Sequence, residues 1–363
     1  MTRILVINPG STSTKIACFE DETCFFSENV LHDALELQQH ESDAAQLELR
    51  RHAILKALEE HGISPAGINA VVGRGGALLP LHGGVYEITD LVVRHVREAI
   101  GGVKHPSNYG AQLADEICKK YECIGYMVNP PTVDELQDVA RLTGIKDIYR
   151  VSRFHALNLK ETAIRHAKSI GKAYEDCNLI VCHLGGGISI SAHRKGQMID
   201  GFAPIGEGPL SPNRCGALPL SELLDYLDSG HSTKEVRNLC TKSGGFVDYF
   251  DTADAQTVLK MAESGSRQAR LVWDAMLYQI GKAIGSMAVV LEGNVDGILL
   301  GGGMVYSEDL VRQISRSCSF VAPIFAYPGE FEMEAMAAGA LRAIRGEEAV
   351  KVYSEEPIWS GLS

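Results

Sequence analysis

The sequence predicts an α/β protein built from two related domains. Helical periodicity alternates with short apolar strands along the chain, which is typical of this class. Three strands end in runs of small residues, at positions 8–14, 185–187 and 301–303, and this ordered recurrence indicates related halves. At 363 residues the chain is longer than one hydrophobic core usually supports. We therefore expect two domains that bind a nucleotide.

The expected elements follow from periodicity. Helices are predicted over residues 44–61, 91–100, 109–121, 157–170, 263–291 and 332–345, with the fifth broken between Gly281 and Gly285. Strands are predicted over residues 4–7, 70–72, 125–128, 179–183, 188–192 and 297–300. The domains are expected to span residues 1–153 and 154–351, followed by a tail over 352–363. The last helix either caps the second domain or crosses back to the first.

The segment RILVINPGSTSTKIACFE, residues 3–20, predicts a hairpin whose tip can bind phosphate. An apolar run is followed by turn-forming residues, and the strand pattern then resumes. Small residues let backbone N–H groups approach an anion, while the hydroxyl groups of Ser11 and Ser13 and the charge of Lys15 add to the attraction. The segment lacks the GxxxxGK[ST] pattern of a Walker loop. An ordinary hairpin turn is the alternative interpretation.

Charge and composition exclude several classes of partner. The formal net charge is −12 and there is no run of lysine or arginine, which argues against nucleic acid or an anionic membrane as a partner. A protein this acidic must concentrate positive charge locally to handle phosphate. Lys15, Arg74 and Arg214 lie within glycine-rich segments and are the candidates for this role.

Cysteine and histidine spacing predicts neither a disulfide framework nor a structural zinc site. The nine cysteines include no CxxC pair, and the twelve histidines show no HExxH or finger-like spacing. The sequence enters a strand at once, which leaves no room for a signal peptide, and the apolar region 280–300 is interrupted by charged residues. We expect a protein of the reducing cytoplasm.

Six motifs carry a resemblance to a known family. They are NPGSTSTK at 8–15, VGRGG at 72–76, KHPSN at 104–108, RFHALN at 153–158, HLGGGISI at 183–190 and IGEGPLSPNRCGALP at 205–219. In this order they resemble the motifs of the butyrate kinase family, within the acetate kinase branch of the superfamily that includes actin, hexokinase and the Hsp70 ATPase domain. The resemblance extends to about residue 350.

The resemblance implies two actin-like (ribonuclease H-like) domains with the active site in the cleft between them. It implies a reversible reaction in which ATP and a short-chain carboxylate give ADP and an acyl phosphate, with Mg²⁺. A carboxylic acid with a pKa near that of Glu, about 4.3, is already ionised at neutral pH, so no general base is needed. The resemblance also implies a homodimer or a larger homo-oligomer.

Site residues are carried over where the motifs match. As catalytic residues the resemblance implies Arg74 and Arg214, whose planar groups suit carboxylate and phosphoryl oxygens, together with His183 and His155. As phosphate or nucleotide contacts it implies Asn8, Ser11, Ser13, Lys15, Gly185, Gly186, Gly187, Gly301, Gly302 and Gly303. His105 and Asn108 are expected to line the substrate cleft. The alternatives are interdomain salt bridges for the arginines and ordinary buried polar groups for the histidines.

The metal contacts include one departure from the family pattern. Glu332 matches a glutamate that acts on magnesium, directly or through water. Asn129 stands where the family pattern has an aspartate, which removes a negative charge, and Asp134 is the nearby candidate to replace it.

The preferred acid stays open at this point. Isobutyrate, propionate and acetate are alternatives to butyrate, because discrimination per methylene is only about 1–3 kcal/mol. A nucleotide-dependent chaperone or a sensor of the same fold is the alternative outside catalysis.

Overall fold

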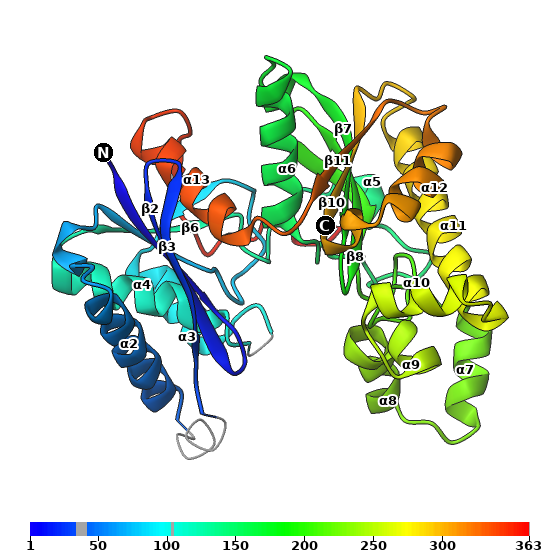
Figure 1. The fold of residues 1–363 in the computed structure, drawn as a ribbon, viewed down its shortest axis with the longest axis horizontal. Helices are drawn as coiled ribbons and strands as arrows, with labels where there is room; N and C mark the ends of the chain where they lie inside the picture. The colour runs from blue at the N-terminus through cyan, green and yellow to red at the C-terminus, as the bar shows by residue number, and fades with distance from the viewer. Residues whose placement is uncertain (34–41, 103–104, 363) are drawn as a thin grey trace. The chain divides into compact units, whose positions relative to one another are not determined.

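A computed structural model describes residues 1–33, 42–102 and 105–362, so that Lys104 of the KHPSN motif lies outside the described residues. Backbone contacts divide the chain into two units (Figure 1). The first comprises Met1–Asp134 and Phe331–Ser363, and the second comprises Glu135–Glu330.

The first unit is organised around a mixed sheet with the strand order β12-β5-β6-β4-β1-β2-β3. Its strands are β1 (Arg3–Pro9), β2 (Ser13–Glu20), β3 (Thr23–Leu31), β4 (Ala70–Gly73), β5 (Val85–Glu87), β6 (Ile124–Val128) and β12 (Val350–Lys351). The predicted hairpin is confirmed, because β1 and β2 pair antiparallel with Asn8 opposite Lys15. Strand β4 runs parallel to β1 with Ile7 opposite Gly73, so Asn8 and Arg74 leave the sheet at the same edge.

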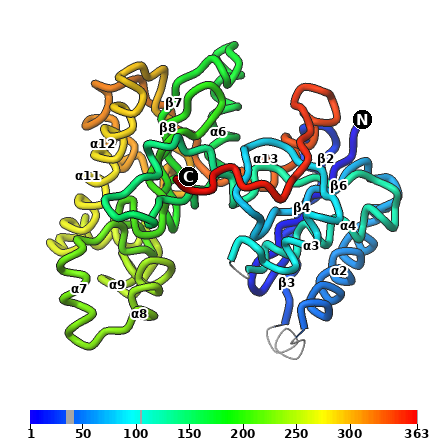
Figure 2. Tube along the Cα trace, turned by 180° about the vertical axis from the view of Figure 1, so that it is seen from behind, coloured from blue at the N-terminus to red at the C-terminus, as the bar shows by residue number. Residues whose placement is uncertain are grey.

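Helices cover both faces of this sheet. They are α2 (Asp43–Glu60), α3 (Asp90–Glu98), α4 (Asn108–Tyr121) and α13 (Glu332–Ile344). Figures 1 and 2 show α13 on one side of the strands and α3 and α4 on the other. Helix α13 contacts β1, β4 and β6, so the C-terminal part of the chain completes the core formed by the N-terminal part.

The second unit repeats the strand arrangement of the first. Its strands are β7 (Asn178–Leu184), β8 (Ile188–Arg194), β9 (Gln197–Phe202), β10 (Gly297–Gly302) and β11 (Ile324–Pro328), in the order β11-β10-β7-β8-β9. In both units an antiparallel meander is followed by strands parallel to its first member. His183 on β7 lies opposite Ser189 and beside Gly301, just as Ile7 on β1 lies opposite Ile16 and beside Gly73. The expectation of related halves is thus confirmed.

The second sheet is also covered on both faces. The helices of this unit are α5 (Asp138–Arg141), α6 (Ala156–Ser169), α7 (Leu220–Asp228), α8 (Thr233–Asn238), α9 (Phe246–Phe250), α10 (Ala255–Glu263), α11 (Arg267–Val290) and α12 (Glu308–Cys318). Helix α6 contacts β7 and β10, while α11 contacts β7, β8 and β9, and Figures 1 and 2 show the two helices on opposite sides of the strands. Trp273, Met276, Ile280 and Ile284 of α11 belong to the apolar core.

The predicted break between Gly281 and Gly285 in the long helix α11 is wrong. Helix α11 runs unbroken through Gly281 and Gly285, because its buried face offsets the low helix propensity of glycine. The chain breaks earlier, between α10 and α11. There Gly265 adopts a φ of +100° and the Ser266 side chain caps the new helix by accepting from the Ala269 N–H.

The boundary between the two units falls after Asp134, whereas the sequence predicts a boundary near residue 153.

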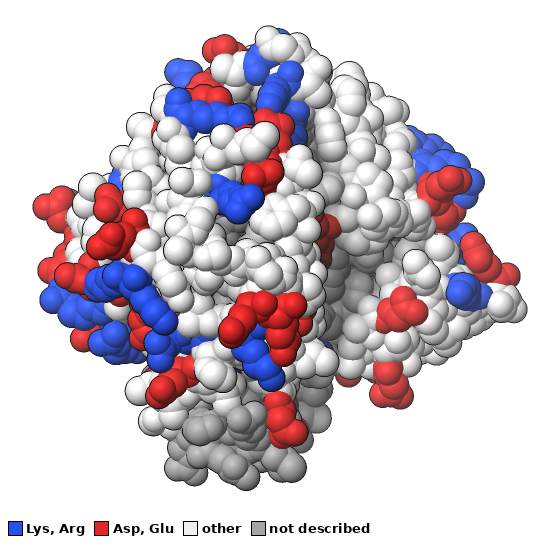
Figure 3. Space-filling view, turned by 60° about the vertical axis from the view of Figure 1, so that its left-hand side comes forward, with Lys and Arg blue, Asp and Glu red and all other residues white. Residues whose placement is uncertain are grey.

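Five of the nine cysteines are buried, and all nine are free thiols. Over the described ranges, no helix is long and apolar enough to cross a membrane. On the face drawn in Figure 3, lysines and arginines occur in small groups with acidic side chains next to them.

Candidate functional site

The first unit gathers Asn8, Lys15, Arg74 and Glu332 at one edge of its sheet. The Nδ2 of Asn8 donates to Oε2 of Glu332 at 2.8 Å, and Nη2 of Arg74 lies 3.6 Å from the other carboxylate oxygen. Lys15 is exposed and lies opposite Asn8 on β2, so the two side chains project from the same face. Residues that are far apart in the sequence therefore form one polar cluster.

Arg74 is largely enclosed by the protein but keeps hydrogen-bonding capacity. Its side chain is 12% exposed, its N–H donates to the Ile7 carbonyl at 2.9 Å, and within the described part of the chain its Nη1 has no hydrogen-bond partner. The neighbouring glycines permit this position. A Cβ at Gly73 would lie 2.2 Å from the Gly110 carbonyl oxygen, so strand β4 and helix α4 can be in contact only through glycine. A buried donor of this kind is suited to an anionic ligand.

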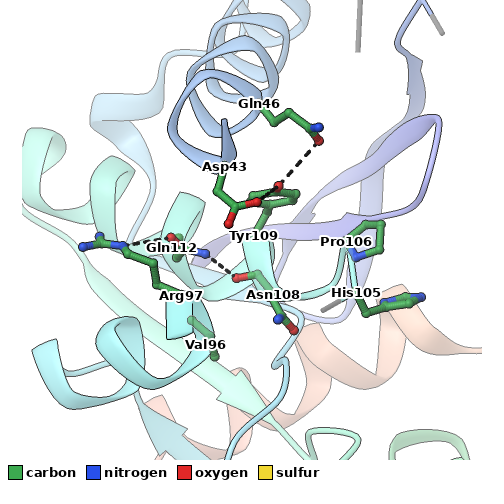
Figure 4. A pocket seen from close by; sticks show the side chains of 9 residues that line it. All are labelled: Asp43, Gln46, Val96, Arg97, His105, Pro106, Asn108, Tyr109 and Gln112. Carbon is green, nitrogen blue, oxygen red and sulfur yellow. Dashed lines mark hydrogen bonds between the residues drawn. The ribbon is translucent and has the colours of Figure 1, made fainter. Parts of the chain in front are cut away.

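His105 and Asn108 line a cavity of about 150 Å³ near the N-termini of α2 and α4 (Figure 4). The Nδ1 of His105 accepts from the Ser107 N–H at 3.2 Å, and burial together with the charge of Arg74 lowers the pKa of His105. Asn108 has a structural role as well, because its Oδ1 accepts from the Ala77 N–H at 2.9 Å. Burial and the charge of Arg74 thus both favour the neutral form of the His105 imidazole.

Asn129 and Asp134 are both buried. The Oδ1 of Asn129 accepts from the Gly84 N–H at 2.8 Å, and its backbone has a φ of +38°, a conformation that asparagine tolerates better than most residues. Asn129 therefore shapes the turn after β6. The N–H of Asp134 donates to the Leu81 carbonyl at 2.8 Å.

In the second unit, His183 and His155 lie against each other. Their ring centroids are 4.3 Å apart, Nδ1 of His155 is 2.8 Å from the Ser189 hydroxyl, and Nε2 of His183 is 3.8 Å from Oε1 of Glu330. His183 is buried and His155 is half-buried. Ser189 is also the cross-strand partner of His183, so it lies beside both histidines.

The turn at Gly185, Gly186 and Gly187 packs directly against Arg214. A Cβ at Gly187 would lie 2.5 Å from Cζ of Arg214, so the guanidinium fits there only because this residue is glycine. The Gly186 carbonyl accepts from the Ser211 hydroxyl at 2.8 Å. Burial lowers the pKa of Arg214, and its Nε has no hydrogen-bond partner among the described residues.

A cavity of about 440 Å³ opens beside this glycine turn. Gly185, Gly186 and Gly303 line it, whereas Gly301 and Gly302 are buried in β10. Its other walls come from residues for which the sequence offered no motif, among them Gln256, Leu259, Lys260, Glu263, Trp273 and Tyr306. Asp254 is of a residue type that commonly caps helices, and it caps the start of α10. The position of α10 beside the glycine turn, however, depends on tertiary packing.

The donor set fits a magnesium ion that arrives with a nucleotide better than a resident metal ion. Across the described ranges, no group of three His, Cys, Asp or Glu side chains could hold a metal. Mg²⁺ commonly binds through one or two carboxylates together with substrate phosphates and water. Glu332, whose side chain is 30% exposed, has the right chemistry for such a single contact.

Comparisons with known proteins identify the relatives of this chain. A model described as "Acetokinase family" matches residues 145–320. Butyrate kinase 1 of Clostridium acetobutylicum is 42% identical over 97% of this chain and all of its own length. A probable butyrate kinase of Coprothermobacter proteolyticus is 45% identical over 97% of this chain and 99% of its own length. The crystal structure of Porphyromonas gingivalis acetate kinase is similar in fold, with a TM-score of 0.78 at 18% identity, over 95% of this chain and all of that chain.

Proposed function

Because the chain belongs to the acetokinase family, we propose that it is an ATP-dependent kinase that phosphorylates the carboxylate of butyrate or a related short-chain acid. The observation that carries this proposal is the full-length identity to a butyrate kinase, which confirms the family resemblance of the six motifs. In the reaction, a carboxylate oxygen forms a bond to the γ-phosphorus of ATP and the bond from that phosphorus to the β,γ-bridging oxygen breaks. ADP and the acyl phosphate are the products, and the step is reversible.

The nucleotide is assigned to the second unit. The cavity of about 440 Å³ is of the size that small-molecule sites have, and the glycine turn at its mouth allows phosphate oxygens close to the backbone. Trp273, Leu259 and Met304 supply apolar wall, and Gln256, Lys260 and Glu263 supply polar groups. We assign the nucleoside to this cavity and its phosphates to the side of Gly185–Gly187.

Phosphoryl transfer between two anions requires positive charge. The half-buried side chains of Arg74 and Arg214 each retain one buried nitrogen without a hydrogen-bond partner among the described residues, and Lys15 is exposed beside Asn8. We assign these three cations, with Ser11 and Ser13, to the reacting carboxylate and the transferring phosphoryl group. His183, with His155 packed on it, is a hydrogen-bonding group for the phosphoryl oxygens. Neither histidine is needed as a nucleophile or a base when transfer is direct and in line.

Magnesium is assigned to Glu332. When bound, the ion neutralises charge on the nucleotide phosphates. Glu332 would hold it, directly or through water, while Asn8 and Arg74 fix the orientation of the carboxylate. Asp134 is the second candidate, whereas the Asn129 side chain already accepts a hydrogen bond from the Gly84 N–H in its turn.

The test of the function is an acceptor panel. Straight and branched acids of two to five carbons are incubated with ATP and Mg²⁺, and the acyl phosphate is trapped with hydroxylamine. We expect the most product from butyrate or an acid one methylene away, since one methylene changes burial by only about 0.8 kcal/mol. Absence of hydroxamate from every acid would refute the kinase proposal and favour the chaperone or sensor alternative.

Removing either guanidinium should slow turnover strongly without unfolding the protein. We expect Arg74→Ala and Arg214→Ala each to lower kcat by roughly 10²- to 10³-fold, the loss typical of a missing oxyanion donor. The exposed, ion-paired Arg94 and Arg270 provide matched controls in the first and second units, and their alanine variants should keep near-normal rates. Near-normal kcat in a folded Arg74→Ala or Arg214→Ala variant would remove that residue from the catalytic set.

The metal assignment predicts a change in magnesium dependence. Glu332→Gln should raise the Mg²⁺ concentration that gives half the maximal rate by about tenfold or more. Glu334→Gln, on the exposed side of the same helix, and Asn129→Asp should leave it within about twofold. An unchanged Mg²⁺ requirement in Glu332→Gln would contradict the assignment. If Asn129→Asp instead lowered the Mg²⁺ concentration for half the maximal rate by much more than about twofold, residue 129 would belong to the metal site.

We also propose that the chain forms a homodimer or a larger homo-oligomer. Helix α7 has no buried residue among those described, and its Leu220 and Leu224 are 64% and 53% exposed. Exposed leucines on one helix are suited to a subunit interface. Sedimentation velocity at micromolar concentration should give at least twice the chain mass of 39.3 kDa, and a monomer mass would contradict the proposal.

A further inference from the structure

A fully buried arginine lies directly behind the first phosphate turn. Arg50, in the middle of α2, is 0% exposed. Its Nη1 donates to the Ser13 carbonyl at 3.0 Å and to the Thr14 hydroxyl at 2.9 Å, and its Nη2 donates to the carbonyls of Gly10 at 2.9 Å and Ser11 at 3.2 Å. One guanidinium thus makes four hydrogen bonds to a single turn.

The surroundings of Arg50 keep both it and its neighbours in place. Its Cζ lies 5.4 Å from the ring centroid of Tyr109, whose hydroxyl donates to Asp43 at 3.0 Å (Figure 4). His32 lies 2.8 Å from the same Thr14 hydroxyl, and burial together with the charge of Arg50 lowers the pKa of His32 to about 4. The cation is therefore packed between an aromatic ring and the turn, next to a neutral histidine.

Burying this arginine has a higher free-energy cost than packing helix α2 against the hairpin with an apolar side chain would have. Removing a guanidinium from water carries a large desolvation cost, whereas the neighbouring Ile54 and Leu58 of α2 pack by apolar burial alone. A buried cation bound to backbone carbonyls fixes peptide planes, which apolar packing does not do.

The fixed peptide planes determine which way the N–H groups point. In a trans peptide the C=O of one residue and the N–H of the next point in opposite directions. With the carbonyls of Gly10 and Ser11 directed at Arg50, the N–H groups of Ser11 and Thr12 are directed to the other side of the turn. Both residues are exposed, so two successive N–H groups face solvent, where backbone donors of this kind can bind an anion.

We propose that Arg50 is a positioning residue for the phosphoryl group that ATP transfers: from behind the turn it orients the backbone donors of Ser11 and Thr12, and it does not itself touch the substrate. This inference depends on the proposed kinase function. It assigns a role in phosphate binding to a residue outside every motif.

The test separates phosphate binding from folding. We expect Arg50→Ala to raise KM for ATP by about tenfold or more and to weaken ATP binding in calorimetric titration, while binding of adenosine and KM for the acid stay near normal. Arg50→Lys should resemble Arg50→Ala, because one ammonium group cannot reproduce the two-armed fork. Millimolar guanidinium, far below denaturing concentrations, should restore part of the activity of Arg50→Ala.

Arg51 provides the matched control. It is the next residue on the same helix, its Nε lies 3.4 Å from Glu116, and its side chain is 36% exposed, so Arg51→Ala should leave both titrations unchanged. Equal losses of ATP and adenosine binding, or an unchanged KM for ATP in a folded variant, would overturn the proposal. If Arg50→Ala does not fold, Arg50→Lys decides by the same measurements. Absence of acyl phosphate from the unsubstituted enzyme would instead contradict the proposed function. The ATP and adenosine titrations would still test whether Arg50 positions the phosphate-binding turn.

Discussion

Close packing between guanidinium groups and glycine-containing turns is the interaction on which both halves of this protein depend. In the first unit Arg50 lies behind the turn and binds its carbonyls. In the second unit Arg214 lies against Gly187, where any side chain would collide with it. In a chain of net charge −12, these contacts keep positive charge at the strand ends where anions are expected to bind. The surrounding strands and helices hold the turns in place for this packing.

The repeated topology explains why two such turns occur. Each unit places an antiparallel hairpin next to a parallel strand, so three chain segments meet at one sheet edge. In the first unit this edge carries Asn8, Lys15 and Arg74, and in the second it carries His183 and Ser189. The same strand arrangement thus places cationic and amide side chains at the sheet edge of the first unit. In the second unit it places a histidine and a glycine turn at the equivalent edge. Glu332 orients Arg74 by charge, whereas Ser189 orients His155 by a hydrogen bond.

Much of the fold could be predicted from the sequence, and the failures have identifiable causes. Periodicity located the predicted helices of the first unit, and apolar runs ending in small residues located the central strands β1, β4, β7 and β10. The break near Gly281 was wrong because burial of one face of α11 outweighs helix propensity. The edge strand β12 and its neighbour β5 were missed because they are short and depend on adjacent strands for hydrogen bonds.

The sequence by itself determined the α/β class, the related halves, the family and the motif residues, because strand periodicity, turn chemistry and ordered motifs are local properties of the chain. Only the tertiary structure assigned Arg50 to the back of the first turn, α10 to the wall of the second unit's cavity and Asn129 to a turn. These assignments depend on contacts between residues that are distant in the chain, and a guanidinium on a helix shows its role only when its hydrogen-bond acceptors are known.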